Sequence, residues 1–200
     1  MHLLISGIPS SGKSTFCRWL EEKKGFLHLD VEKPGVLDQH GLATAWATLF
    51  DAGTSAAPLI EALDKLKRPA VIDWGFPPEH LNTVHRLSEA GIMLWWFAAD
   101  WAVARRKFME RGTIPVGLFD IQLRKIQTVL PDINALFRSH LEYTLPSTGI
   151  YTPPDRIWDS MLDTLVEPAR RRLGAPIPRP TPDTHPSPHP SPHPSQDPNQ

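Results

Sequence analysis

The sequence has very little cysteine and no long apolar run. Cys17 is the only cysteine among 200 residues, which excludes an intramolecular disulfide and favours a reducing compartment. The longest apolar run, residues 92–99, is far shorter than the about 18 residues that a membrane-spanning helix requires. At the N-terminus the run HLLI leads at once into a glycine-rich turn, so no signal peptide is expected. These features predict a cytoplasmic protein that does not contact a membrane.

The chain also lacks an excess of either charge. It has 21 Lys and Arg residues against 22 Asp and Glu residues, a formal net charge of −1 and an isoelectric point near 6.8. Proteins that coat nucleic acids or anionic membranes usually carry a strong basic excess. A nucleic-acid ligand is therefore less favoured than a small molecule, although a local basic pocket remains compatible with this composition.

Large apolar side chains nearly vanish after residue 173. From Gly174 to Gln200 the sequence holds ten prolines and the near-repeat HPSPHPSPHPSQ. Such a segment buries too little apolar surface to offset the entropy lost on ordering. We therefore expect a disordered tail over residues 174–200 and one folded domain over residues 1–173.

Within that domain, short apolar runs alternate with segments that have helical periodicity. Glycines and prolines delimit the segments, and two helices are expected between residues 39 and 67. This alternation predicts an α/β fold with three layers and a mostly parallel, five-stranded sheet. The strands are expected at residues 3–6, 26–30, 70–73 and 92–100, and within residues 143–151.

Three aspartates follow these expected strands. They are Asp30, Asp73 and Asp100, each at a carboxyl end. In parallel α/β sheets ligands bind beyond that edge. Asp100 also precedes a helical segment, so we expect it to act as a helix N-cap.

The strongest motif in the chain is the glycine-rich turn after the first strand. Residues 7–14 read GIPSSGKS and match G-x-x-x-x-G-K-[ST] at every fixed position. Glycines let successive backbone N–H groups point into one concavity, and the start of the following helix adds its positive dipole end. The motif predicts that Lys13 contacts the β- and γ-phosphates of a nucleotide and that the Ser14 hydroxyl binds Mg²⁺. The expected nucleotide-binding residues are Gly7, Ile8, Pro9, Ser10, Ser11, Gly12, Lys13, Ser14 and Thr15.

On this motif and its strand–helix context, the chain resembles the P-loop kinases, over about residues 1–172. The group includes gluconate, shikimate, adenylate and polynucleotide kinases and the zeta-toxin-like phosphotransferases. The resemblance implies a P-loop NTPase fold with a helical lid that uses ATP and Mg²⁺. ATP is preferred to GTP on this resemblance and because the chain has no N-K-x-D motif.

The resemblance also implies roles for three residues outside the loop. Asp30 is similar in position to the carboxylate that orients or deprotonates the acceptor hydroxyl. Asp73 looks like the Walker B aspartate, a Mg²⁺ ligand, and Arg111 like the lid arginine that stabilises charge on the transferred phosphoryl group. The chain departs from the family's pattern at His80, which stands near the place of an arginine in many relatives.

The sequence leaves several functions open. The leading hypothesis is a phosphotransferase that moves the γ-phosphate of ATP to a hydroxyl or phosphate of a small metabolite or nucleotide. A nucleic-acid acceptor is less favoured. The alternatives are a nucleotide-gated switch or NTPase without phosphoryl transfer, and a binding module whose tail recruits a partner.

Overall fold

The computed structural model describes residues 1–51, 53–112, 115–137 and 140–172. The expected tail over residues 174–200 lies outside these residues, and so does the expected domain boundary. No helix in the described part is both long and apolar enough to cross a membrane.

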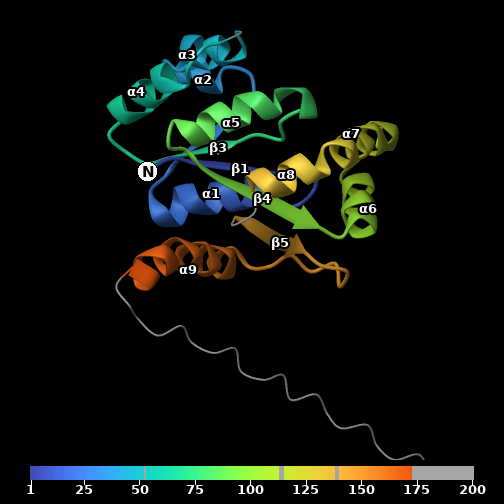
Figure 1. The fold of residues 1–200 in the computed structure, drawn as a ribbon. Coiled ribbons are helices and arrows are strands. Elements are labelled where there is room, and N and C mark those ends of the chain that lie inside the picture. The colour runs from blue at the N-terminus through green and yellow to red at the C-terminus, as the bar shows by residue number, and fades with distance from the viewer. Residues whose placement is uncertain (52, 113–114, 138–139, 173–200) are drawn as a thin grey trace, which may run out of the picture.

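A five-stranded sheet forms the centre of the molecule (Figure 1). Its strands are β1 (Leu3–Gly7), β2 (Leu27–Asp30), β3 (Ala70–Asp73), β4 (Met93–Ala99) and β5 (Leu141–Leu145). Their order is β2-β3-β1-β4-β5, and every pair in the sheet is parallel. The expected α/β fold and five-stranded sheet are therefore confirmed. The last strand begins earlier than predicted, at Leu141 rather than within residues 143–151.

Helices cover both faces of the sheet. On one face lie α1 (Lys13–Lys24) and α9 (Pro154–Arg172), as Figure 1 shows. They pack against every second side chain of the central strands, such as Leu3, Ile5 and Trp95. Because side chains alternate along a strand, their neighbours Leu4 and Trp96 face the opposite layer.

That opposite layer contains most of the remaining helices. It includes α4 (Ala57–Lys65), α5 (Leu81–Glu89) and α8 (Leu130–Leu136), with the short 3₁₀ turn η2 (Pro78–His80) before α5. The prediction of two helices within residues 39–67 is confirmed by the helices Ala43–Ala47 and Ala57–Lys65. A short helix before them was not predicted. The structure has α2 (Val36–Gln39), α3 (Ala43–Ala47), the 3₁₀ turn η1 (Thr48–Phe50) and then α4.

Two further helices, α6 (Trp101–Arg111) and α7 (Val116–Thr128), project beyond the sheet. We call them the lid helices. The Asp100 carboxylate accepts a hydrogen bond of 3.0 Å from the Val103 N–H and caps α6, as predicted. The lid helices follow the carboxyl end of β4, so they stand beside the edge where ligands bind in such sheets.

Candidate active site

The turn between β1 and α1 adopts a conformation that its glycines make accessible. Gly7 has φ 146° and Gly12 has φ 92°, both values that other residues rarely adopt. A Cβ added at Gly7 would lie 2.3 Å from the Phe97 carbonyl oxygen on β4. The first glycine of the motif is thus needed for space as well as for backbone conformation. The helix α1 begins at Lys13, so the expected helix start is confirmed.

Lys13 lies against the turn rather than in solvent. Its Nζ donates hydrogen bonds to the carbonyl oxygens of Gly7 and Ile8, at 3.2 and 3.1 Å. Burial lowers the pKa of the Lys13 ammonium, while the Asp73 and Glu32 carboxylates act in the opposite direction. Because burial destabilises the charged form of Lys13, the binding of an anion beside this ammonium is favourable.

A cavity of about 700 Å³ opens in front of this turn, within the range of about 300–1,000 Å³ typical of small-molecule sites. Every residue of the predicted phosphate-binding turn lines it except Ile8, whose side chain is buried in the core. Asp73 and Arg111 line it too, so the structure brings these two together with the turn. Asp30 is not among the lining residues.

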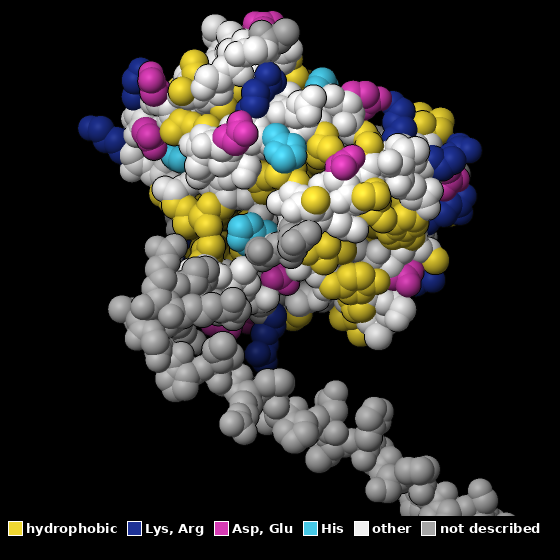
Figure 2. Space-filling model, viewed as in Figure 1, with side chains coloured by type: hydrophobic (Ala, Val, Ile, Leu, Met, Phe, Trp, Pro, Cys, Tyr) yellow, Lys and Arg dark blue, Asp and Glu magenta, His cyan; other side chains and the backbone are white. Residues whose placement is uncertain are grey.

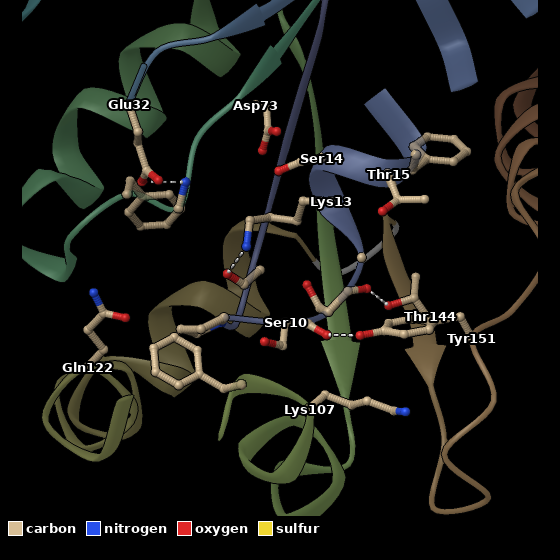
Figure 3. Close-up of a pocket in the computed structure, with 18 of the residues that line it drawn as sticks. Ser10, Lys13, Ser14, Thr15, Glu32, Asp73, Lys107, Gln122, Thr144 and Tyr151 are labelled. Carbon is tan, nitrogen blue, oxygen red and sulfur yellow. Dashed lines mark hydrogen bonds between the residues drawn. The ribbon is translucent and has the colours of Figure 1, made fainter. Parts of the chain in front are cut away.

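The carboxylate that faces the cavity from the β2 end is instead that of Glu32. It accepts a hydrogen bond of 3.2 Å from the Gly75 N–H and lies near Lys13 (Figure 3). Burial raises the pKa of Glu32, with Lys13 acting in the opposite direction. The Asp30 carboxylate accepts from the Glu32 N–H at 3.3 Å and thereby caps the turn. The sequence signal for Glu32 was a second acid two residues beyond the strand end.

Asp73 ends β3 at the floor of the cavity, with 3% of its surface exposed. In Figure 3 the Ser14 hydroxyl points toward its carboxylate. Hydroxyl and carboxylate oxygens are the ligands that Mg²⁺ takes in nucleotide sites. Asp73 Oδ2 also lies 3.3 Å from His28 Nε2 and accepts a hydrogen bond from it when that nitrogen carries the proton.

The lid helices supply the basic wall of the cavity. Lys107 and Arg111 from α6 line it, as does Lys125 from α7. Figure 2 shows Lys and Arg side chains gathered at this edge of the molecule. Arg105, which does not line the cavity, joins the two helices through bonds of 2.8 and 3.0 Å to the Asp120 carboxylate. This ion pair ties α6 to α7, while Lys107 and Lys125 pair with Glu110 and Glu79 at 3.3 and 2.6 Å.

Two residues that the sequence reasoning missed line the same cavity and hold the turn in place. The Thr144 hydroxyl on β5 donates to the Ser11 carbonyl oxygen at 2.6 Å, and the Tyr151 hydroxyl donates to the Ser10 carbonyl oxygen at 2.9 Å. Thr144 is 2% exposed. Its position at the end of a strand was the one signal that pointed to it.

The turn also fits a phosphate group by its free donors. The Ser10 and Ser11 hydroxyls are buried and have no hydrogen-bond partner among the described residues. A buried hydroxyl without a partner costs about 1–3 kcal/mol, which phosphate oxygens would recover. Lys13, these hydroxyls and the turn's N–H groups would hold the phosphates of ATP, and Ser14 with Asp73 would hold Mg²⁺.

No protein-family model matches the sequence, and no curated protein matches it. Among solved structures, a gluconokinase from Sinorhizobium meliloti 1021 is 14% identical, with 86% of this chain and 95% of that chain covered and a TM-score of 0.47. A shikimate kinase from Bacteroides thetaiotaomicron is 12% identical, with 87% and 98% covered and a TM-score of 0.46. A deoxyadenosine kinase from M. mycoides, bound to its products, is 12% identical, with 84% and 100% covered and a TM-score of 0.44.

These likenesses are too distant to carry an activity or a substrate to this chain. What the chain itself provides is the parallel sheet, the phosphate-binding turn after β1 and the lid helices after β4. The protein therefore has a P-loop kinase-like fold.

Proposed function

We propose that this protein is an ATP- and Mg²⁺-dependent phosphotransferase. It moves the γ-phosphate of ATP to a hydroxyl or phosphate of a small metabolite or nucleotide. The observation that carries the proposal is the half-buried Lys13 ammonium, which donates to the turn's carbonyl groups and lines one cavity with the Asp73 and Glu32 carboxylates. We also propose the cytoplasm as its location, as the lone cysteine favours.

Each part of the cavity then has a task. Lys13 and the turn bind the β- and γ-phosphates, Ser14 and Asp73 bind Mg²⁺, and Arg111 stabilises charge on the transferred group. When bound, Mg²⁺ neutralises charge on the phosphate oxygens. Most of the rate gain comes from holding the acceptor oxygen in line with the phosphorus atom.

Two carboxylates are candidates for the group that holds the acceptor. Asp30 is the candidate that the sequence favours, and Glu32 is the one that the geometry favours, because it faces the cavity and Lys13. Its raised pKa suits a general base, since a base works best when its pKa is near the working pH. We therefore assign this role to Glu32, with Asp30 shaping the turn that carries it.

Nucleotide binding tests the foundation of the proposal. Lys13→Ala removes charge-assisted hydrogen bonds of about 1.5–3 kcal/mol, so ATP affinity should fall by about 10- to 150-fold. Lys23→Ala on the exposed end of the same helix is the matched control and should leave affinity unchanged. Equal affinities of the Lys13→Ala variant and the parent would refute the proposal.

Turnover tests the transfer step. A screen of alcohols, sugars, nucleosides and nucleotides by coupled ADP release should find a compound that raises ADP release above the rate with water alone. With that acceptor, Glu32→Gln should lower kcat by about 10²–10⁴-fold while ATP affinity persists. If no compound stimulates release, and a protein partner stimulates hydrolysis that Asp30→Ala and Glu32→Gln leave intact, the protein is a nucleotide-gated switch.

A further inference from the structure

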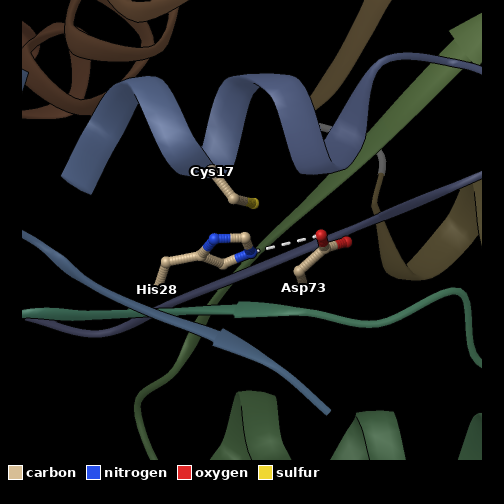
Figure 4. Close-up of side chains that lie close together, drawn as sticks. All are labelled: Cys17, His28 and Asp73. Carbon is tan, nitrogen blue, oxygen red and sulfur yellow. Dashed lines mark hydrogen bonds and ion pairs between the residues drawn. The ribbon is translucent and has the colours of Figure 1, made fainter. Parts of the chain in front are cut away.

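Three metal-binding side chains converge beneath α1, each from a different element. Cys17 comes from α1, His28 from β2 and Asp73 from β3 (Figure 4). The Cys17 sulfur, a His28 ring nitrogen and an Asp73 carboxylate oxygen all lie within 4.8 Å of one another. Cys17 is fully buried, and the side chains of His28 and Asp73 are 11% and 5% exposed. The cluster is therefore dry and is built from parts of the chain far apart in sequence.

The chemistry of these ligands selects a class of ion. Thiolate sulfur, imidazole nitrogen and carboxylate oxygen together suit Zn²⁺ and its substitute Co²⁺. Mg²⁺ takes oxygen ligands and keeps several waters, so it gains nothing from Cys17 or His28. The cluster thus differs in kind from the oxygen site that Ser14 and Asp73 offer.

The spacing is close to that of a metal centre. In a tetrahedral zinc site with bonds of about 2.0–2.3 Å, neighbouring ligand atoms are about 3.3–3.7 Å apart. His28 Nε2 and Asp73 Oδ2 are already at 3.3 Å. Since no pair exceeds 4.8 Å, the Cys17 sulfur needs to approach by about 1 Å at most.

We propose that Cys17, His28 and Asp73 form a binding site for a zinc-class transition metal ion. As the metal–sulfur bond forms, the thiol proton leaves to solvent, so binding releases one proton.

The site has a consequence for the nucleotide cavity. Asp73 lines that cavity, and the proposed function assigns its carboxylate to Mg²⁺. An ion held by Cys17 and His28 takes the same carboxylate, so the two ions compete. Zn²⁺ is then an inhibitor of the Mg²⁺-dependent reaction, and this consequence alone rests on the proposed function.

Cobalt titration of the full chain tests the metal site directly. Saturation with Co²⁺ should produce a thiolate-to-cobalt charge-transfer band at one ion per chain, and Zn²⁺ should remove it. Cys17 is the only cysteine, so histidines elsewhere in the chain cannot give this band. Absence of the band in the parent protein would overturn the proposal.

Variants separate the site from a packing cluster. Cys17→Ser should lose the band with an unchanged circular dichroism spectrum, and His28→Asn should weaken Co²⁺ affinity at least about tenfold. His85→Asn, at an exposed position on α5, is the matched control and should keep the Co²⁺ affinity of the parent. A band that persists in Cys17→Ser, or equal Co²⁺ affinities of His28→Asn and His85→Asn, would show that these side chains are not ligands.

Competition tests the consequence separately. Zn²⁺ should inhibit Mg²⁺-dependent ATP turnover in the parent at least about tenfold more strongly than in Cys17→Ser. Equal inhibition with an intact cobalt band would retain the metal site and reject the competition at Asp73. If the parent protein does not bind ATP, the proposed function is rejected and the cobalt result still supports the metal site.

Discussion

Gly7→Ala is the substitution whose cost the structure specifies most closely. The new Cβ would lie 2.3 Å from the Phe97 carbonyl oxygen and 3.0 Å from the Phe97 carbonyl carbon. Gly7 and Phe97 face each other in the pairing of β1 with β4, so neither backbone moves without disturbing the sheet. Overpacking costs about 1–3 kcal/mol and an unfavourable backbone conformation about 1–3 kcal/mol. The free energy of unfolding should therefore fall by about 2–6 kcal/mol.

Gly25→Ala provides the control. Gly25 ends α1 with φ 73°, yet no atom lies within 4 Å of the position that a Cβ would take. Its replacement carries only the conformational cost, about 1–2 kcal/mol. Urea unfolding followed by tryptophan fluorescence measures both variants. Equal urea midpoints for the two variants would refute the steric argument.

The same pair separates stability from binding. The clash at Gly7 displaces the first residue of the phosphate-binding turn, so ATP affinity should fall along with stability. Gly25 lies at the far end of α1, and its replacement should leave ATP affinity unchanged. Isothermal titration at a temperature where both variants are folded measures this difference. An unchanged ATP affinity in Gly7→Ala would show that the turn tolerates the displacement.

Three further predictions use thermal or urea unfolding. Asp100→Ala removes the cap of α6 and should cost about 1 kcal/mol, whereas unchanged stability would exclude a role for the bond to the Val103 N–H. Thr144→Val removes the buried donor to the Ser11 carbonyl oxygen and should cost about 1–3 kcal/mol, with weaker ATP binding; stability within error of the parent would contradict this. The Glu32 carboxyl has a raised pKa in the folded protein, so its ionisation destabilises the fold as pH rises above the usual carboxyl range. The free energy of unfolding of Glu32→Gln should thus equal that of the parent in acid and exceed it at neutral pH. A difference in unfolding free energy that stays constant across pH would refute this sign.

The sheet could be predicted because its strands are buried. A strand covered on both faces is apolar along its length, and β1, β3 and β4 all show this pattern. The two edge strands differ: β2 alternates between buried and half-buried residues, and β5 carries exposed Leu141 and Tyr143. The mixed composition of β5 resembles a loop, which is why its start was misplaced.

The segment between β2 and β3 was hard to predict for a related reason. Its helices are short and depend on tertiary contacts more than on periodicity. Trp46 from α3 packs edge-on against Trp74, which follows β3, with ring centroids 5.1 Å apart. A contact between residues this far apart in the chain leaves no local pattern, so the sequence predicted the two helices α3 and α4 but neither α2 nor the exact limits.

In the candidate site, too, some residues could be predicted from local sequence and others depend on the tertiary structure. The phosphate-binding turn and Asp73 follow from a local motif and from the rule that strand ends share one edge. That rule places residues at the edge but does not say which side chain turns inward. At β2 the chain curls after the strand, so Asp30 caps the turn and Glu32 faces the cavity.

The hydrogen bonds to the carbonyl oxygens of the phosphate-binding turn explain how the turn can bind an anion without a change in its backbone conformation. The carbonyl oxygens of Ser10 and Ser11 are held by Tyr151 and Thr144, while Lys13 holds those of Gly7 and Ile8. The Ser11 N–H donates within the turn to the Ile8 carbonyl oxygen at 3.3 Å, whereas the N–H groups of Gly12, Lys13 and Ser14 have no backbone acceptor among the described residues. A phosphate chain then displaces only the two bonds of Lys13, whose ammonium gains an anionic partner in exchange. We expect Thr144 and Tyr151 to keep these bonds when an anion binds, so that the ordering cost of the turn is met during folding rather than during binding.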